Sequence, residues 1–419
     1  MSGDYFMRYI NMKKYSVLSI IIILIIFNLI ACKNKDNIST LDKNSRGDLS
    51  ISVPRELIPY MNQYTEEFNK YYPNVKVNIS LEKDISKGKK ETDIIIVKSE
   101  HAKYFINKFK DDFLNLEELL SKYRKNFKDS NLEAVSSDKG IHGIDLSSNP
   151  YLMIYRKDVY EKCNINIEDI KTWHDYVENS RYINKKLNKN YKFMHNYNNI
   201  DLYDIFLNQL GRGYKDEKEN KTIVSGEAIR AVELINIFNK NQIIYREENN
   251  SLVEALKSEE VVSTICTATD VYNIMEKLPS MKGQYEIKKI PGFILAGNRN
   301  VSRKGYSVLV FKGRNNKASR TFLKFMIENE QFQEKMFKNE KILPFNMNVY
   351  KSKSLNKKED FFNDKNIFKL MYDVYKKSPN IKYNEDYEDI RKNINKTLKI
   401  INNEDFNIEK FIQEVSKKK

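Results

Sequence analysis

Cysteine and histidine are scarce in this chain, which has 3 cysteines and 4 histidines among 419 residues. So few cysteines cannot form a disulfide framework, and we expect Cys163 and Cys266 to be buried free thiols, with one bridge between them as the alternative. No metal-ligand spacing joins the histidines, which are His101, His142, His174 and His195. The sequence therefore predicts no metal site and no cofactor.

Motifs of common hydrolases and nucleotide-binding enzymes are also missing. The chain has no G-x-S-x-G, no H-E-x-x-H and no G-x-x-x-x-G-K-[ST]. Adjacent carboxylates such as Glu66 and Glu67 would point apart on a helix, so we expect them to be solvated. These absences predict a protein that is not an enzyme.

Charge of both signs is abundant, with 72 lysines and arginines against 57 acidic residues and a formal net charge of +15. The lysines are spread along the chain among Asp, Glu and Asn, and no nucleic-acid-binding motif is present. We therefore expect no nucleic-acid partner. The positive balance instead favours attraction to an anionic cell envelope.

One long apolar run lies near the N-terminus, from Val17 to Ala31, interrupted by Ser19 and Asn28. It is shorter than the about 20 residues that a spanning helix needs. The lysines at 13 and 14 precede it, which is typical of a secretory signal peptide. Translation starts at Met1, Met7 or Met12, and the sequence leaves the three open.

The end of this run, Leu29-Ile30-Ala31-Cys32, resembles the bacterial lipobox. In that signal the cysteine thiol receives a diacylglycerol and the chain is cut before the cysteine. The resemblance implies a signal peptide over residues 1–31 and a lipid, including palmitate, on Cys32. A polar tether over 32–47 would then hold the protein on the extracytoplasmic face of the cell membrane. The alternative is an uncleaved anchor in which the cysteine is incidental.

The residues that follow alternate between strand and helix patterns. Strands are predicted over 49–53, 75–81 and 93–97, and helices over 55–72, 100–109 and 113–123. This alternation predicts an α/β architecture with a parallel sheet. A chain of 419 residues also exceeds the length that one hydrophobic core usually supports, so more than one domain is expected.

The second half of the chain is richer in helix patterns. A strand running into a short helix is predicted over 149–160, further strands over 261–268 and 305–311, and a helix over 315–338. The remaining helices are predicted over 225–240 and 251–258, with two more over 384–415.

Six stretches, in order, resemble those of one family. They are EEFNKYYPNVKVNI (66–79), TDIIIVKSEHAKYF (92–105), GIHGIDLSSNPYLMIYRKDVYEKCNI (140–165), KTWHDYVE (171–178), the stretch 318–350 and the stretch 394–415. The chain resembles bacterial extracellular solute-binding proteins of ABC importers, the maltose-binding-protein-like, sugar-associated group. Two segments depart from the family pattern: a connection of only eleven residues over 82–92, and a segment over 256–270 without the family's glycine.

The resemblance implies a type II periplasmic-binding-protein-like fold with two lobes, a hinge and an interlobe cleft. Lobe I would comprise 48–148 and 303–346, and lobe II would comprise 149–302 and 347–419. The protein would be a monomer that carries a small-molecule solute, most often a carbohydrate, to ABC permease subunits. A non-sugar solute, a ligand-presenting sensor subunit and an adhesin-type lipoprotein remain alternatives.

Ligands of open α/β sheets bind outside the carboxyl ends of the strands. That rule selects nine candidate ligand-binding residues: Arg55, Glu56, Ser99, Glu100, Asn149, Tyr151, Thr269, Asp270 and Tyr306. For each of them, helix capping or solvation is the competing interpretation.

Aromatic residues could supply stacking faces for a sugar. Trp173 is the one tryptophan, and the helix start at Thr172 favours a packing role for it. Tyr197 and Tyr203 are then the stacking candidates, with core packing as the alternative for both.

Overall fold

The structure is a computed structural model that describes residues 45–81, 92–146, 148–195, 197–216, 220–247, 251–399 and 408–416. The predicted signal peptide, Cys32 and most of the tether lie outside these residues. All of these described residues belong to one compact unit. Within its described part, no helix combines the length and the apolar character needed to cross a membrane.

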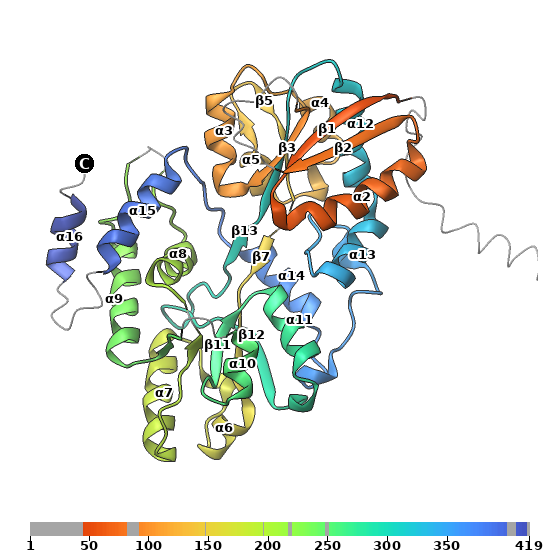
Figure 1. Cartoon of the computed structure of the whole chain (residues 1–419). Coiled ribbons are helices and arrows are strands. Elements are labelled where there is room, and N and C mark those ends of the chain that lie inside the picture. The colour runs from red at the N-terminus through yellow and green to blue at the C-terminus, as the bar shows by residue number, and fades with distance from the viewer. Residues whose placement is uncertain are drawn as a thin grey trace, which may run out of the picture. The chain divides into compact units, whose positions relative to one another are not determined.

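A five-stranded sheet forms the core of the first lobe, in the order β2-β1-β3-β14-β6 (Figure 1). The strands are β1 (Gly47–Val53), β2 (Val75–Leu81), β3 (Ile94–Lys98), β6 (Gly143–Asp145) and β14 (Tyr306–Val310). Strand β1 pairs in parallel with β2 and β3, whereas β14 runs antiparallel to β3 and to β6. The strands predicted over 49–53, 75–81, 93–97 and 305–311 are confirmed.

The position of β3 explains its sequence. Its residues Ile94 to Val97 are fully buried, as expected for a strand covered on both faces. At the edge of the sheet, β6 approaches β14 so closely that a Cβ on Gly143 would lie 1.7 Å from the Val308 carbonyl oxygen. Only glycine allows this pairing.

Helices pack on both faces of this sheet. They are α2 (Ile58–Tyr71), α3 (Ala102–Lys108), α4 (Glu117–Ser121), α5 (Asp129–Glu133), α12 (Asn316–Glu328) and α13 (Glu330–Glu340). Aromatic contacts join α2 to α12, for example Tyr64 and Phe68 with Phe322, whose ring centroids are 5.0 and 4.9 Å apart. Short 3-10 turns precede α2 and α3, at Arg55–Leu57 and Ser99–His101. The small strands β4 (Ser136–Ser137) and β5 (Gly140–Ile141) complete the lobe.

Two helix predictions in this lobe need correction. The single helix predicted over 315–338 is two helices, because Asn329 ends α12 and its side chain accepts a hydrogen bond from the Phe332 N–H that caps α13. The helix predicted over 113–123 is confined to α4, since Phe113 forms a bridge with Phe311 beside the sheet. The cap at Asn329 and the bridge at Phe113 therefore each interrupt a sequence pattern that is typical of a helix.

Strands β7 (Ser148–Pro150) and β13 (Ser302–Lys304) form an antiparallel pair between the two larger sheets (Figure 1). These segments coincide with two of the chain crossings that the family resemblance implies. The exact lobe boundaries stay a prediction.

The second lobe contains a three-stranded sheet in the order β11-β8-β12, formed by β8 (Leu152–Arg156), β11 (Ser263–Cys266) and β12 (Tyr285–Lys289). Both neighbours run antiparallel to β8, whereas the parallel sheet predicted from residues 49–123 concerns the first lobe, where β1 is parallel to β2 and β3. All residues of β8 and β11 are buried, and buried strands of either direction share this apolar pattern. The short strands β9 (Met194–His195) and β10 (Ile244–Tyr245) pair in parallel nearby.

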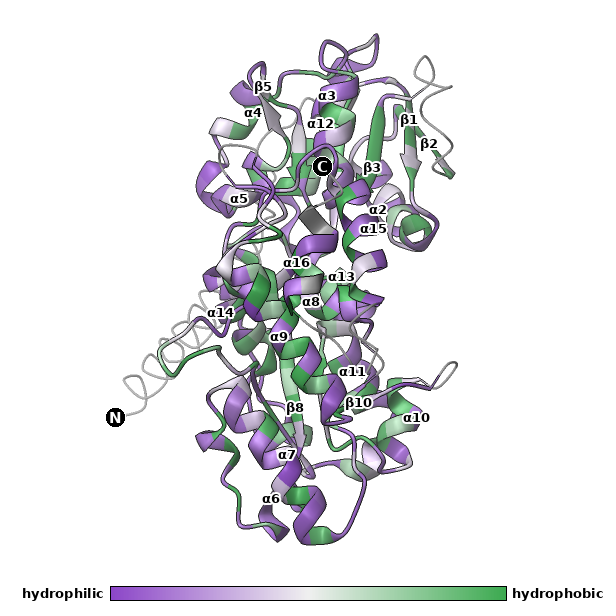
Figure 2. Cartoon of the chain, turned by 90° about the vertical axis from the view of Figure 1, so that its left-hand side faces the viewer, coloured by the Kyte–Doolittle hydropathy of each residue, from purple (hydrophilic) through white to green (hydrophobic). Residues whose placement is uncertain are grey.

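Four longer helices belong to this lobe: α7 (Trp173–Leu187), α8 (Asn199–Gln209), α9 (Gly226–Lys240) and α11 (Ala268–Lys277). Two helices of six residues accompany them, α6 (Lys157–Lys162) after β8 and α10 (Leu252–Lys257) before β11. Figure 2 shows β8 as a hydrophobic strand among helices of mixed hydropathy. Helix α7 begins at Thr172 with a capping box to Asp175, as predicted. Trp173 is buried against Tyr176, Phe206 and Phe238, which confirms its packing role. Cys163 and Cys266 are buried free thiols, as expected.

The C-terminal region adds α14 (Ile367–Lys377), α15 (Tyr387–Leu398) and α16 (Ile408–Ser416). Ile390, Ile394 and Leu398 of α15 join the hydrophobic core of the second lobe. Residues 378–386, here called the C-terminal strap, link α14 to α15 along the first lobe. The Lys128 ammonium donates to the Ser378 carbonyl at 2.7 Å, which fixes the start of the strap.

Candidate functional site

Two neighbouring cavities lie beside the β7–β13 pair. The first, of about 200 Å³, is here called the tyrosine pocket, and its lining residues are Tyr151, Tyr197, Asp201, Asp204, Ile205, Asn208, Thr267, Arg303, Tyr383 and Tyr387. The second, of about 500 Å³, is here called the strap pocket, and its lining residues are Ser99, Lys103, Asn107, Ser130, Glu133, Ala134 and the strap residues 380–385. Tyr383 of the C-terminal strap lines both cavities, so the two cavities are neighbours that share this residue.

Each tyrosine of the tyrosine pocket comes from a different point of the fold. Tyr151 directly follows β7, and its N–H donates to the Val301 carbonyl at 2.9 Å. Tyr197 follows β9 and donates its hydroxyl to the Ile265 carbonyl at 3.4 Å. Tyr387 opens α15, where its ring meets that of Tyr383 edge-on at 4.8 Å. Together with Tyr383 they bring four tyrosines to the lining of one cavity.

Burial decides the protonation of these hydroxyls. It raises the pKa of Tyr151 to about 12, and it raises the pKa of Tyr197, Tyr383 and Tyr387 above the ordinary tyrosine value as well. The hydroxyls therefore remain neutral at physiological pH and can donate hydrogen bonds.

Two carboxylates of α8 supply the negative charge of the tyrosine pocket. Arg391 of α15 binds both, donating to Asp201 at 2.7 Å and to Asp204 at 2.9 Å. Tyr214 donates its hydroxyl to the other Asp204 oxygen. Burial raises the pKa of Asp204 to about 6, although Arg391 and Tyr214 act to lower it.

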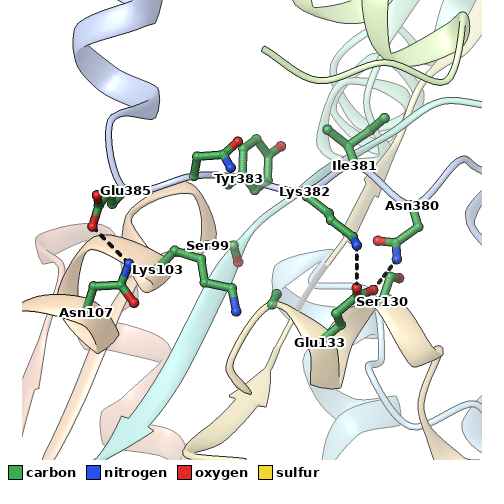
Figure 3. Close-up of a pocket in the computed structure, with 12 residues that line it drawn as sticks. Ser99, Lys103, Asn107, Ser130, Glu133, Asn380, Ile381, Lys382, Tyr383 and Glu385 are labelled. Atoms are coloured by element: carbon green, nitrogen blue, oxygen red, sulfur yellow. Dashed lines mark hydrogen bonds and ion pairs between the residues drawn. The ribbon is translucent and has the colours of Figure 1, made fainter. Parts of the chain in front are cut away.

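The strap pocket is polar and is closed on one side by the C-terminal strap. Figure 3 shows Glu133 facing Lys382 and Asn380, with separations of 3.0 and 2.5 Å, and Asn107 donating to Glu385 at 2.9 Å. Aromatic faces in one cavity and paired donors and acceptors in the other suit a polar molecule with apolar faces. The arrangement contains binding groups and lacks, among the described residues that line it, a histidine or cysteine that could act as a nucleophile or general base.

The model of the family described as bacterial extracellular solute-binding protein matches residues 55–331 of this chain. The chain belongs to this family. Its membership places this solute-binding protein outside the cytoplasm and confirms the family resemblance inferred from sequence.

Relatives agree with this assignment. An arabinooligosaccharide-binding protein of Bacillus subtilis (strain 168) is 23% identical over 362 residues, which cover 80% of this chain and 82% of the relative. Among solved structures, the sugar-binding protein MalE of Xanthomonas citri has a TM-score of 0.75 at 12% identity, over 88% of this chain and 96% of that chain. The GacH receptor of Streptomyces glaucescens has a TM-score of 0.70 at 13% identity, over 89% and 97%. These likenesses confirm the two-lobe, type II fold.

Four predicted ligand-binding residues of this solute-binding protein lie together at the β7–β13 pair. Tyr151 lines the tyrosine pocket and Ser99 lines the strap pocket. Asn149 of β7 pairs with Arg303 of β13. Glu100 is buried, and Arg303 donates to it at 3.4 Å.

The other five predicted residues line neither cavity. Tyr306 donates its hydroxyl to Glu56 at 2.6 Å, and Arg55 beside it is exposed. Thr269 is exposed on α11, while the Asp270 carboxylate caps that helix by accepting from the Thr267 N–H at 2.8 Å. Their binding role stays a prediction.

Sequence reasoning missed eight residues that line the tyrosine pocket, although one of them, Thr267, directly follows β11. They are Asp201, Asp204, Ile205 and Asn208 of α8, Thr267 and Arg303, and the tyrosines at 383 and 387. Tyr197, one of the two stacking candidates, does line the tyrosine pocket. The other, Tyr203, is fully buried in the core of the second lobe, so its packing alternative is the one that the structure supports.

Proposed function

We propose that this solute-binding protein captures an oligosaccharide in the tyrosine and strap pockets and delivers it to the permease subunits of an ABC importer. The observation that carries the proposal is the meeting of four tyrosines with Asp201, Asn208 and Arg303 around one cavity. Sugars combine apolar CH faces, which stack on aromatic rings, with hydroxyls that need both donors and acceptors. No bond is made or broken in this role.

Size favours an oligosaccharide over a single sugar. The strap pocket of about 500 Å³ falls within the range of about 300–1,000 Å³ typical of ligand sites, and Tyr383 connects it to the tyrosine pocket. Because the Bacillus subtilis relative is an arabinooligosaccharide-binding protein, arabino-oligosaccharides are the first ligands to test.

Ligand contacts from both lobes would stabilise the closed arrangement relative to the open one. In this proposal lobe I comprises 48–148 and 303–346, and lobe II comprises 149–302 and 347–419. The β7–β13 pair is then the hinge, and the closed monomer is the form that the permease recognises.

The N-terminal sequence supports attachment of the protein to the membrane. The lipobox over 29–32 supports cleavage before Cys32 and lipid attachment to its thiol, and a lipid with two chains suffices for stable anchoring. Labelling cells with palmitate tests this. We expect label on the wild type and none on Cys32→Ala, and equal labelling of the two would refute the anchor.

Calorimetric titration of the purified full-length chain in mild detergent tests the ligand. The panel contains arabino-, malto- and galacto-oligosaccharides, with peptides and polyamines as the non-sugar arm. We expect an oligosaccharide to bind, and Tyr197→Ala and Tyr387→Ala each to weaken it by about 10-fold, or about 1.4 kcal/mol. Tyr182→Ala, which removes an exposed tyrosine of α7, is the matched control and should change nothing. If peptides bind and no oligosaccharide does, the proposal of a carbohydrate ligand is wrong.

A further inference from the structure

Three side chains that could ligate a metal converge beside the pockets without lining them. Glu100 and His101 end the 3-10 turn after β3, and Glu388 lies in the first turn of α15. One ligand atom from each lies within 4.8 Å of the other two. The sequence gives no hint of this cluster, because 287 positions separate His101 from Glu388.

One separation, that between His101 and Glu388, is close to that of a metal centre, while the Glu100 oxygen lies within 4.8 Å of both. His101 Nε2 lies 3.1 Å from Glu388 Oε1. Ligand atoms around one tetrahedral Zn²⁺, with bonds of about 2.0–2.2 Å, stand about 3.3–3.5 Å apart. A rotation of the Glu100 carboxylate toward this pair would complete three ligands around one ion.

The Glu100 side chain supplies an independent sign that a cation belongs here. It is only 8% exposed, and within the described part of the chain the one cation that reaches it is Arg303, at 3.4 Å. That contact is longer than the about 2.7–2.9 Å of a charge-assisted hydrogen bond. A buried carboxylate is costly unless it is closely paired or coordinates a metal. His101 and Glu388, which are 34% and 40% exposed, leave a path by which an ion can enter.

We propose that Glu100, His101 and Glu388 bind one divalent transition-metal ion of the Zn²⁺ class, with water in the fourth position. One imidazole nitrogen and two carboxylate oxygens suit Zn²⁺ and its neighbours, whereas Ca²⁺ and Mg²⁺ prefer oxygen ligands alone. Two carboxylates balance the charge of the ion. Arg303, the present partner of Glu100, is 52% exposed and also lines the tyrosine pocket.

The ion would join two parts of the fold that otherwise meet through weak contacts. Glu100 and His101 belong to the lobe of the five-stranded sheet, while α15 is fixed to α8 of the second lobe by Arg391. The metal would therefore link the first lobe to α15, beside Tyr387 of the tyrosine pocket. This inference does not depend on which solute the protein carries.

Calorimetric titration with ZnCl₂ tests the site, using the purified full-length chain in mild detergent after treatment with a chelator. We expect one Zn²⁺ per chain with micromolar or tighter affinity, and no heat from Mg²⁺ or Ca²⁺ at the same concentrations. His101→Gln and Glu388→Gln should each weaken Zn²⁺ binding by more than about 100-fold, because even outer partners of metal ligands contribute 10–100-fold. His174→Gln, which changes an exposed histidine of α7, should leave it unchanged.

A second measurement separates the site from a folding defect. The melting temperatures of the wild type, His101→Gln and Glu388→Gln should agree in the presence of chelator, and Zn²⁺ should raise only that of the wild type. Co²⁺ bound to the wild type should show the visible absorption of a four-coordinate ion. Unaltered Zn²⁺ affinity in His101→Gln, or no binding to the wild type at about 100 µM, would overturn the proposal.

Discussion

Asp204 shows how single residues of the tyrosine pocket combine burial with charge. Its carboxylate lies on α8, holds Arg391 and Tyr214, and still has its pKa raised to about 6 because burial disfavours the charged form. The ordinary value is 3.8. In the folded state this group therefore takes up its proton at a higher pH than in the unfolded chain.

That difference predicts a pH-dependent stability. Because the folded pKa lies above the unfolded one, the contribution of Asp204 is fully present below about pH 4 and is lost as the pH rises through 6. Urea unfolding of the wild type and Asp204→Asn at pH 4.5 and pH 7 measures it. We expect the stability of the wild type relative to the variant to fall by about 2 kcal/mol over this range. Parallel pH profiles for the two proteins would contradict the prediction.

The helices that surround the site owe much of their placement to caps at their ends. At α11, Thr267 and Asp270 form a capping box, in which the Asp270 carboxylate also accepts from the Thr267 hydroxyl at 2.7 Å. Thr267 lines the tyrosine pocket, so the cap also orients a lining residue.

Asp270→Ala should therefore lower the free energy of unfolding by about 1 kcal/mol, which is typical of a lost N-terminal cap. Thr269→Ala, at the exposed position next to it, should change stability by less than about 0.5 kcal/mol. Urea titration of both variants measures the difference. If Asp270→Ala instead weakens sugar binding at unchanged stability, Asp270 contacts the ligand, as the sequence rule for strand ends suggests.

The C-terminal strap is held to the first lobe mainly by partly exposed polar groups. The Glu133–Lys382 pair has side chains that are 45% and 55% exposed. Glu133→Gln should cost less than about 1 kcal/mol of stability, since exposed ion pairs contribute little. It should nevertheless weaken ligand binding several-fold, because Glu133 lines the strap pocket.

Glu178→Gln is the matched control for this variant, because it breaks the exposed Arg181–Glu178 pair of α7, which lines neither pocket. Calorimetry should show that Glu178→Gln binds the oligosaccharide with the same affinity as the wild type. Equal affinities for the two variants would show that the strap pair has no part in binding.

At the scale of the whole molecule, the sequence predicts the elements better than their directions. The apolar run of β3 and the alternation in β1 identify strands, and Thr172 identifies the start of α7. The antiparallel course of β11 beside β8 could not be predicted, because fully buried strands of either direction have the same apolar pattern. Nor could the break at Asn329, since one polar position fits an amphipathic helix.

The candidate site was harder to predict for a topological reason. Strand ends lead to Ser99 and Tyr151, but Asp204 comes from a helix and Tyr383 and Tyr387 arrive from the far end of the chain. Short-range patterns carry no information about which distant residues, such as Tyr151 and Tyr387, line the same cavity. The family resemblance supplied the two-lobe fold, which composition and periodicity alone left open.

Ligand binding should change the whole molecule. If the β7–β13 pair is a hinge, saturating oligosaccharide should reduce the radius of gyration measured by small-angle X-ray scattering. At a ligand concentration of about 100 times Kd, the free energy of unfolding should also rise by about 2.7 kcal/mol. Stabilisation without any change in the radius would indicate binding to one lobe in a fixed arrangement.

The route of Tyr383 and Tyr387 into the tyrosine pocket has a consequence for the order of events during secretion. Both rings lie near the C-terminal end of a 419-residue chain, after every strand of the two large sheets. A chain that emerges N-terminus first can form both sheets before these rings are available. If the tyrosine pocket binds the solute, capture must therefore wait until Tyr383 and Tyr387 have been delivered. A chain cut before Tyr383 would keep every strand of the two large sheets but would lack two of the four tyrosines of the pocket.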